Sequence, residues 1–441
     1  MGMEKGNKRV INAWAFYDWA NSIYPLVIST TIFPIFYEKV TSKIGTGPKH
    51  DLVQFWGLDV KNTALYSFVV AASILMVSIL SPILSGVADY SGSKKGFLKF
   101  FCYLGAIATG TLYFFNPEEL EWSMLSIFFG SLGFWNSLVF YNAYLPEIAE
   151  PKDHDRVSAK GFSMGYIGAT SLLIVCLVFM NGGIGPENLR FLDAEHVFLI
   201  SGLWWIGFSQ ITYRRLPSPK SYNKVTREIL GNGFKELKQV WQIIKSHTKL
   251  KRFLYSFFMY SMGVQTIMLM AVLFAKKEVF DDDNTGGLII AVLIIQFIAI
   301  LGAYLFSYLS KKIGNIRTLI IAVSIWIFVC CYAFFFVHSP STFYFLAAIV
   351  GLVMGGTQSL SRSTYSKFLP ETNDTASFFS FFDITEKIGI VIGMVIFGLV
   401  ESTSGDIRTS VLALIVFFVI GIILLFRVPR NTEEVIETGK Q

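Results

Sequence analysis

Twelve long apolar stretches constrain this chain more than any other feature of its sequence. A helix that crosses a lipid bilayer needs about 20 mainly apolar residues, and each stretch is close to that length. Because lipid supplies no hydrogen-bond partners, a spanning segment must satisfy its backbone polar groups internally, which favours helices. The sequence therefore predicts an all-α membrane protein with twelve transmembrane helices. The predicted spans are 12–37, 64–88, 97–115, 123–146, 158–181, 196–213, 253–275, 286–309, 317–337, 341–366, 376–400 and 409–427.

The composition also favours a membrane protein over a soluble one. Of the 441 residues, 53% are hydrophobic and 15% are charged, whereas soluble domains average about 25% charged residues. The first apolar run is long and lacks a small-residue cleavage site, so we expect a retained first helix. The cysteines lie inside predicted spans without metal-ligand spacing, and we expect them to be buried apolar residues. They are Cys102, Cys176, Cys330 and Cys331.

The distribution of Lys and Arg predicts the orientation of the helices, because cytoplasmic loops carry an excess of these residues. With both termini in the cytoplasm, 28 of the 37 Lys and Arg residues lie on the cytoplasmic side, 8 lie on the opposite side and Lys387 lies within a span. We therefore expect both termini to be cytoplasmic. The net charge of +6 is spread over many loops, so it indicates orientation and not a nucleic-acid partner.

One long connection, 214–252, divides the predicted helices into two groups of six. We expect an N-terminal six-helix bundle at 1–213, this cytoplasmic linker, and a C-terminal six-helix bundle at 253–441. Apolar residues recur at helical spacing in the linker among basic residues, which predicts an amphipathic helix at the membrane surface. A connector between the bundles is its simplest role, and binding of a partner protein is the alternative. The apolar residues are Phe234, Leu237, Val240, Trp241 and Ile244.

Two short motifs recur in the two halves of the chain. The sequence Leu-Pro-Glu at 145–147 returns 224 residues later at 369–371, and Gly92 has a counterpart 222 residues later in Gly314. Nearly equal offsets, each about half of the chain, predict a duplicated six-helix unit. Transporters commonly bind their substrates between such repeats, near the middle of the membrane.

The loop after the second predicted helix carries residues suited to a turn. Gly92 permits a tight turn between antiparallel helices, and Asp89 ends the helix where it can meet a positive helix N-terminus or a basic side chain. With Lys94 and Lys95, these residues resemble the conserved inter-helix motif of the major facilitator superfamily, which latches one half of such proteins to the other in the outward-open state. The resemblance implies a gating motif, and a generic polar turn is the alternative. The second copy of the loop has Lys311 where the first has its acid.

The first predicted helix carries polar side chains that a spanning helix seldom contains. An acid at mid-bilayer costs roughly 2.5–3.5 kcal/mol, so we expect Asp18 to face a cavity or a partner. Asn21 lies three residues later on the same face, Tyr24 follows it, and Pro25 is expected to bend the helix around a ligand. We predict that Asp18, Asn21 and Tyr24 bind substrate or protons. The alternative places Asp18 among the lipid headgroups.

The tenth and eleventh predicted helices carry a second polar group. Gln358 and Arg362 are neighbours at i,i+4, and so are Asp383 and Lys387, whose order suits an ion pair. Glu386 is then left over and is expected to seek Arg362, a proton or a substrate ammonium group. We predict that these five residues bind substrate or protons, with purely structural ion pairing as the alternative.

Two pairs of glycines, Gly161 with Gly165 and Gly389 with Gly393, lie in the fifth and eleventh predicted helices. Pairs spaced by three residues let helices approach closely. Because these helices are counterparts in the two halves, a sliding or rocking contact is plausible, and static packing is the alternative.

Several strings of residues occur here in the order in which a known family carries them. They are Ala-Trp-x-x-Tyr-Asp-Trp-Ala-Asn-Ser at 13–22, Tyr-Asn-Ala-Tyr-Leu-Pro at 141–146, Gly-Tyr-Ile-Gly at 165–168 and Gly-Gly-x-Gln-x-x-Ser-Arg-Ser at 355–363. The chain resembles the bacterial "unknown major facilitator" family, whose eukaryotic relatives are the autophagy-related vacuolar amino-acid effluxers. The resemblance implies the major facilitator fold, with two six-helix pseudo-repeats, in a bacterial inner membrane. For the vacuolar branch it also implies export of amino acids.

These features favour a secondary transporter that works by alternating access and is coupled to protons. Its expected partners are the lipid bilayer, protons and a small polar or zwitterionic solute, such as an amino acid or a peptide-like compound. A uniporter or exporter of another metabolite or drug-like compound is an alternative, and so is a non-transporting protein such as a lipid scramblase. The five His residues lie in loops or at span ends, and metal-binding HExxH and phosphate-binding GxxxxGK[ST] motifs are absent from the sequence. We therefore expect that the protein is not an enzyme and uses no metal or cofactor. We also expect it to be a monomer.

Overall fold

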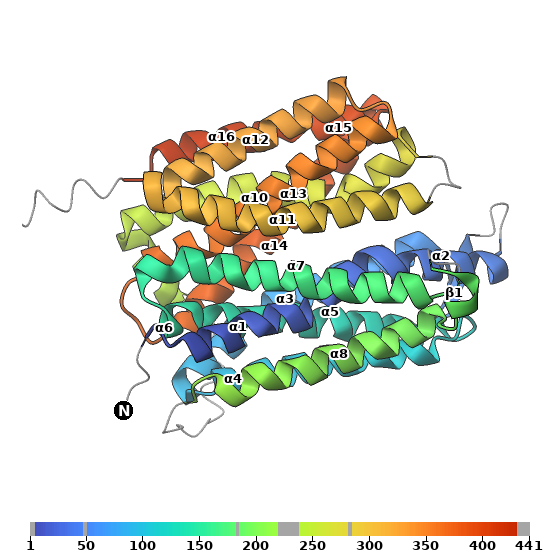
Figure 1. Cartoon of the computed structure of the whole chain (residues 1–441), viewed down its shortest axis with the longest axis horizontal. Coiled ribbons are helices and arrows are strands. Elements are labelled where there is room, and N and C mark those ends of the chain that lie inside the picture. The colour runs from blue at the N-terminus through green and yellow to red at the C-terminus, as the bar shows by residue number, and fades with distance from the viewer. Residues whose placement is uncertain (1–4, 47–50, 182–184, 219–237, 281–284, 430–441) are drawn as a thin grey trace, which may run out of the picture. The chain divides into compact units, whose positions relative to one another are not determined.

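The computed structural model describes residues 5–46, 51–181, 185–218, 238–280 and 285–429 of the chain. The chain divides into two compact units, which are described separately below (Figure 1). Unit 1 consists of Met1–Ala149, Gly161–Gly233 and Asp374–Ser380, and unit 2 consists of Glu150–Lys160, Phe234–Asn373 and Phe381–Gln441.

Unit 1 is almost entirely helical. Helix α4 packs along α5 and α8, and α1 also packs along α8. The helices are α1 (Lys8–Asn21), η1 (Tyr24–Ile32), α2 (Phe33–Ile44), α3 (Asn62–Ser91), α4 (Lys94–Thr111), η2 (Leu112–Phe114), α5 (Leu120–Ala143), α6 (Leu145–Ile148), η4 (Glu187–Leu189) and α8 (Ala194–Arg215), together with most of α7 (His154–Phe179).

Unit 2 is built from the remaining helices. Helix α11 packs along α13, and α10 packs along α16 (Figure 1). The helices are η3 (Pro151–Asp153), α10 (Thr248–Glu278), α11 (Thr285–Ile313), α12 (Asn315–Phe335), α13 (Pro340–Phe368), α15 (Ile407–Ala413) and α16 (Ile415–Phe426), together with most of α14 (Thr375–Ser404).

Two short segments fall in the unit formed by the opposite half of the sequence. Helix α7 starts in unit 2 and continues in unit 1 from Gly161, and α14 starts in unit 1 and continues in unit 2 from Phe381. The bundle boundaries expected from the sequence, 1–213 and 253–441, do not include this exchange. The first turns of α7 and α14 are therefore places where polar contacts join residues from both sequence halves within one unit.

Nine helices among the described residues are long and apolar enough to cross a membrane. Each overlaps one predicted span, and the span predicted at 317–337 is helix α12 at Asn315–Phe335. The other three predicted spans correspond to helical segments outside these nine, namely α1 with η1 and α2, α8, and α14. A mostly helical fold with apolar spanning helices is confirmed, and the count of twelve spans stays a prediction.

The first predicted span changes helix type along its length. Helix α1 is followed by the π-helix Tyr24–Ile32, which has Pro25 in its first turn, and by α2, which has Pro34 in its first turn. Proline lacks a backbone N–H and interrupts regular helical hydrogen bonding. The hydroxyl of Thr31 donates to the carbonyl oxygen of Leu26 at 2.6 Å. The irregularity expected at Pro25 thus takes the form of a π-helical segment.

A β-hairpin that the sequence did not predict follows α2. Strands β1 (Leu52–Phe55) and β2 (Leu58–Lys61) are antiparallel, and the two turn residues, Trp56 and Gly57, have φ angles of +48° and +77°. Two consecutive positive φ angles are typical of the two-residue turn of a hairpin, and Asn-Gly is the usual sequence of that turn. The side chain of Glu121 accepts a 2.9 Å hydrogen bond from the Trp56 backbone N–H. Trp-Gly replaces the usual turn residues here, so the sequence did not indicate a hairpin.

Glycines permit the closest helix contacts inside each unit. In unit 1, a Cβ added at Gly168 would lie 2.4 Å from the carbonyl oxygen of Trp19, and one at Gly165 would lie 2.4 Å from Ser22 Oγ. In unit 2, a Cβ added at Gly393 would lie 2.3 Å from Thr266 Oγ1. The close approach predicted from the glycine pairs is therefore confirmed at Gly165, for α7 against α1, and at Gly393, for α14 against α10. A Cβ added at Gly389 would make only ordinary contacts, the nearest at 3.4 Å.

The end of the predicted linker helix packs on protein. Residues 238–246 are helical, Val240 and Ile244 are buried, and the Trp241 ring stacks on Phe381 with ring centres 5.3 Å apart. Phe234 and Leu237 lie outside the described residues. The apolar side of this segment thus contacts protein within unit 2, and its position at the membrane surface stays a prediction.

Candidate substrate and gating sites

Asp18 lies on α1 inside unit 1 and is 5% exposed. The hydroxyl of Tyr141, on α5, donates a 2.7 Å hydrogen bond to Asp18 Oδ2. The Tyr141 ring stacks on Trp14, one turn before the acid, with ring centres 4.4 Å apart. This stacking holds the hydroxyl against the carboxyl group. Asp18 is therefore buried against protein, as expected for an acid that faces a partner, and its depth in the membrane stays a prediction.

Asn21 and Tyr24 continue the polar side of the first helix. Asn21 is 1% exposed, and its Nδ2 atom has no hydrogen-bond partner among the described residues. The Tyr24 ring stacks on Phe134 of α5, with ring centres 5.3 Å apart. The structure therefore places Asp18, Asn21 and Tyr24 in the interior of unit 1, with an amide donor of Asn21 still available.

The acids and the base of α14 lie in the interior of unit 2. Lys387 Nζ contacts Asp383 Oδ1 at 2.5 Å, and the two side chains are 0% and 9% exposed, which confirms the predicted pair within the helix. Asp383 Oδ2 is buried and has no hydrogen-bond partner among the described residues. Glu386 has a partner that the sequence did not predict, because the amide of Gln265 on α10 donates to Glu386 Oε1 at 2.6 Å.

The guanidinium group of Arg362, on α13, holds the start of α7. Its Nε and Nη2 atoms donate to Ser158 Oγ and to the Ser158 carbonyl oxygen, each at 2.9 Å. Arg362 is 4% exposed. Gln358, one turn earlier, lies 3.5 Å from the sulfur of Met268. Arg362 therefore has a structural partner in unit 2 that the sequence did not indicate.

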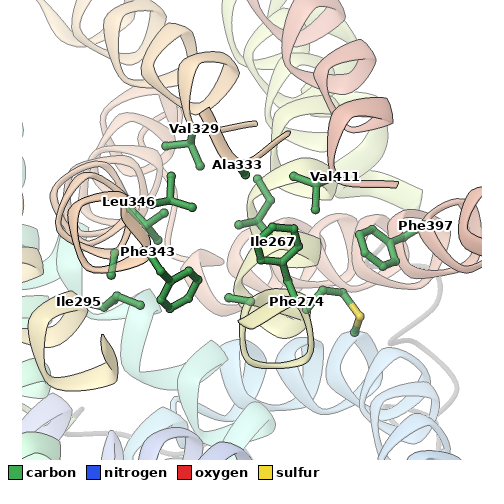
Figure 2. A pocket seen from close by; sticks show the side chains of 13 residues that line it. Ile267, Phe274, Ile295, Val329, Ala333, Phe343, Leu346, Phe397 and Val411 are labelled. Carbon is green, nitrogen blue, oxygen red and sulfur yellow. The ribbon is translucent and has the colours of Figure 1, made fainter. Parts of the chain in front are cut away.

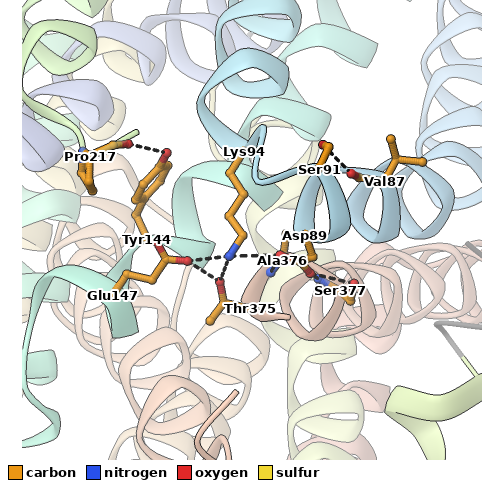
Figure 3. A network of polar contacts seen from close by, with 10 residues as sticks. All are labelled: Val87, Asp89, Ser91, Lys94, Tyr144, Glu147, Pro217, Thr375, Ala376 and Ser377. Atoms are coloured by element: carbon orange, nitrogen blue, oxygen red, sulfur yellow. Dashed lines mark hydrogen bonds and ion pairs between the residues drawn. The ribbon is translucent and has the colours of Figure 1, made fainter. Parts of the chain in front are cut away.

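The predicted gating residue Asp89 meets both kinds of partner expected for it (Figure 3). Its carboxylate accepts hydrogen bonds from the backbone N–H groups of Ala376 and Ser377 at 3.2 and 2.8 Å, and from Ser377 Oγ at 2.8 Å. These donors form the first turn of α14, where the helix dipole also favours an anion. Lys94 Nζ lies 3.0 Å from Asp89 Oδ1. The acid is thus bound by a helix N-terminus and by a basic side chain.

Lys94 joins this acid to a second one. Its Nζ contacts Glu147 Oε1 at 2.5 Å and donates to Thr375 Oγ1 at 2.7 Å (Figure 3). We call Asp89, Lys94, Glu147, Thr375 and Ser377 the Asp89 cluster. The repeated Leu-Pro-Glu motif contained Glu147, but the sequence did not link it to the gating loop.

The other two residues of the predicted gating motif shape its loop. Gly92 ends α3 with a φ of +67° and a ψ of +19°, a left-handed conformation that favours glycine. Lys95 Nζ donates to the carbonyl oxygen of Leu216, just after α8, at 2.9 Å. Lys95 therefore fastens the loop to unit 1 and lies outside the ion-pair cluster.

Unit 2 also contains a cavity that is lined only by apolar surface (Figure 2). Ile267 and Phe274 of α10, Phe343 and Leu346 of α13, and Val411 of α15 project into it. Moving an ammonium or carboxylate group into such surroundings without hydrogen-bond partners is costly. This cavity is therefore unsuited to a zwitterionic solute.

The structure gathers the predicted site residues into separate groups. Unit 1 holds Asp18, Asn21 and Tyr24, and unit 2 holds the five polar residues of α13 and α14. The sequence analysis did not assign Tyr141, Ser158 or Gln265 to a site, because they lie far along the chain from the residues they bind. Tyr141 begins the family string at 141–146, but that string did not indicate its contact with Asp18. Within the described residues, no group of three or more His, Cys, Asp or Glu side chains is placed to hold a metal ion.

Comparisons with known proteins give the family context of these sites. The sequence family described as "Vacuole effluxer Atg22 like" matches residues 6–435. An "Uncharacterized MFS-type transporter YxiO" of Bacillus subtilis (strain 168) is 31% identical over 426 residues, covering 96% of this chain and 95% of that protein. "Autophagy-related protein 22-1" of Penicillium rubens is 23% identical over 555 residues, covering 99% of this chain and 92% of that protein.

Solved structures show the same fold. The major facilitator superfamily transporter FucP, in its outward conformation, matches with a TM-score of 0.66 and 14% identity, over 97% of this chain and 99% of FucP. At this identity the likeness concerns the fold, and it confirms the major facilitator fold expected from the sequence. The relatives are described as transporters and not as enzymes.

Proposed function

Because this chain belongs to the vacuole effluxer Atg22-like family of major facilitator transporters, we propose that it carries a small zwitterionic solute, such as an amino acid or a peptide-like compound. Transport is driven by protons through alternating access, and its direction is efflux. The name of the family, which describes vacuolar effluxers, supports that direction.

The observation that carries the proposal is the charged group buried on α14. Placing charges inside a membrane span is costly, which makes such residues functional candidates. The pair of Asp383 and Lys387 offers one charge of each sign, and Asp383 Oδ2 has no partner among the described residues. A zwitterion also carries both charges, so its ammonium group suits Asp383 and Glu386, and its carboxylate suits Lys387. Gln358 and Arg362 would extend the same polar surface.

Asp18 is the proposed proton carrier. Its carboxyl group is buried and accepts a hydrogen bond from Tyr141. Binding or release of a proton there changes a charge that is shielded from water, and such a change strongly affects the energy of the surrounding structure. Asn21 and Tyr24, on the same helix, are proposed to contact the solute.

The Asp89 cluster is proposed to gate transport, in the role that its motif has in the major facilitator superfamily. The cluster binds the first turn of α14, the helix that also carries Asp383 and Lys387. Release of that turn would free the start of the helix that bears the proposed substrate-binding residues.

We also propose that the protein is a monomer in the bacterial cytoplasmic membrane with both termini cytoplasmic. The uneven distribution of Lys and Arg supports this orientation. Cysteines introduced at exposed loop positions, and labelled from one side of intact cells with an impermeant maleimide, test it.

Transport is tested with the purified chain in liposomes, with a panel of labelled amino acids and dipeptides and with an imposed pH gradient. We expect at least one zwitterion to accumulate only when the gradient is present. Asp18→Asn should abolish this dependence on the gradient while exchange of solute across the membrane continues. Lys387→Met should abolish both activities, because it removes the site for the carboxylate.

Glu118→Gln, at an exposed acid in a loop of unit 1, is the matched control and should behave as wild type. Accumulation that ignores both the gradient and Asp18→Asn would refute proton coupling. Flipping of dye-labelled lipids without transport of any solute would instead support a scramblase.

A further inference from the structure

The first turn of α7 is held in unit 2 by a cluster that the repeated loop motif does not predict. Asp155, the second residue of α7, has a side chain that is 1% exposed. Lys367 Nζ contacts its Oδ2 atom at 2.5 Å, Ser310 Oγ donates to Oδ2 at 2.8 Å, and Asn315 Nδ2 donates to Oδ1 at 2.7 Å. We call these four residues the Asp155 cluster.

The donors to Asp155 come from the ends of three helices. Ser310 lies at the end of α11, Asn315 begins α12, and Lys367 lies at the end of α13. They also bind one another, because Lys367 Nζ donates to Asn315 Oδ1 at 2.9 Å. The ends of α11, α12 and α13 therefore together form a binding site for one carboxylate.

The sequence offset of 222 residues relates this cluster to the Asp89 cluster. The position that matches Asp89 is Lys311, which is exposed. The second loop therefore has a base, and not an acid, at the position from which Asp89 binds α14. The position that matches Ser377 of α14 is Asp155 of α7. In the first half of the chain the acid precedes the loop and the hydroxyl that binds it, Ser377, lies on α14. In the second half the acid lies on α7, and the hydroxyl that binds it is Ser310 at the end of α11.

We propose that the Asp155 cluster is a second gating site of reversed polarity, in which Asp155 and Lys367 are positioning residues for transport. The proposal rests on transport itself, which the family establishes, and not on the identity of the solute. A carboxylate with so little exposure is satisfied only while the first turn of α7 stays against α11, α12 and α13. Its release requires Asp155 and Lys367 to be hydrated together, so the cluster favours one arrangement of α7 over another.

Distance measurements on the full chain in lipid nanodiscs test this without any solute. Spin labels are placed at exposed positions in the two units, with Arg214→Cys and Arg317→Cys on a Cys331→Ser background. Asp155→Asn should change the ratio of the populated distances by about tenfold, the equivalent of losing one hydrogen bond to a charged group. Asp155→Lys combined with Lys367→Asp should return the ratio toward that of wild type.

The control is Lys311→Gln, which alters the matched but exposed position and should leave the distances unchanged. A merely structural cluster would give a lower unfolding temperature for Asp155→Asn with an unchanged distance distribution, and this result would overturn the proposal. Where Asp155→Asn does not fold, Ser310→Ala serves as the milder variant, with a smaller shift in the same direction expected. Unchanged distances in folded Ser310→Ala would equally overturn it.

Discussion

The Asp89 cluster of unit 1 and the Asp155 cluster of unit 2 bind the first turns of two corresponding helices by opposite arrangements. In unit 1 the acid lies in the last turn of α3 and accepts hydrogen bonds from the backbone and hydroxyl groups of α14. In unit 2 the acid belongs to α7 and accepts from side chains on three other helices. Related halves of a chain can therefore keep a polar contact at one place in the fold while the residue that carries the charge changes.

The two clusters also differ in their charges. Lys94 contacts two acids, Asp89 and Glu147, whereas Lys367 contacts one acid and the neutral amide of Asn315. The base in unit 1 therefore compensates more negative charge than the base in unit 2. This difference orders the expected effects of removing each base.

Removing Lys94 should have the largest effect. Lys94→Met removes the base from two acids, Asp89, whose side chain is 2% exposed, and Glu147, whose side chain is 32% exposed. We expect a loss of about 3–5 kcal/mol in unfolding free energy, as for a buried ion pair that loses one partner, and a loss of transport. Thermal unfolding of the purified protein measures the first effect. Stability equal to that of wild type would show that the cluster carries little energy.

Removing Lys367 should have a smaller effect. In Lys367→Met, Asp155 keeps the hydrogen bonds from Ser310 and Asn315. We expect a loss of about 2–3 kcal/mol, near the contribution of one hydrogen bond to a charged group. The same unfolding assay applies, with Lys311→Gln as the control. A larger loss than for Lys94→Met would reverse the ranking of the two clusters.

The two loop glycines should differ in their tolerance of side chains. Gly314 has a φ of +84° with a ψ of 155°, a region open essentially to glycine alone, so Gly314→Asn should cost about 1–3 kcal/mol. Gly92 has left-handed helical angles, which asparagine adopts at helix ends. Gly92→Asn should therefore be nearly neutral in the unfolding assay. Equal losses for both variants would mean that packing around the loops outweighs backbone strain.

The smallest effects are expected for the two hydroxyl groups. Ser377→Ala and Ser310→Ala each remove one donor to a buried carboxylate that keeps other donors. Each should cost about 1.5 kcal/mol, the low end of the range for a hydrogen bond to a charged group, because a neutral hydroxyl is lost. Matching losses in unfolding would support equivalent roles for the hydroxyls in the two clusters, and a loss confined to one variant would show that the roles differ.

Local features of the candidate sites were predictable because helical spacing alone determines them. Asp383 and Lys387 are four residues apart on one helix, so their pairing needs no knowledge of the rest of the fold. Glu386 and Arg362 illustrate the opposite case. Their observed partners, Gln265 and Ser158, lie 121 and 204 residues away, and the packing of separate helices decides which polar groups meet.

The hydropathy of the sequence by itself determined the helical membrane fold, because lipid requires each spanning segment to satisfy its own backbone. The repeated motifs likewise located the loop of Asp89 and its counterpart at Gly314. Only the tertiary structure decided that the counterpart loop binds its incoming helix through Asp155. A repeat in the sequence identifies matching positions along the chain. The partner of a buried charge depends instead on which helix ends meet, and residues distant in the sequence determine that.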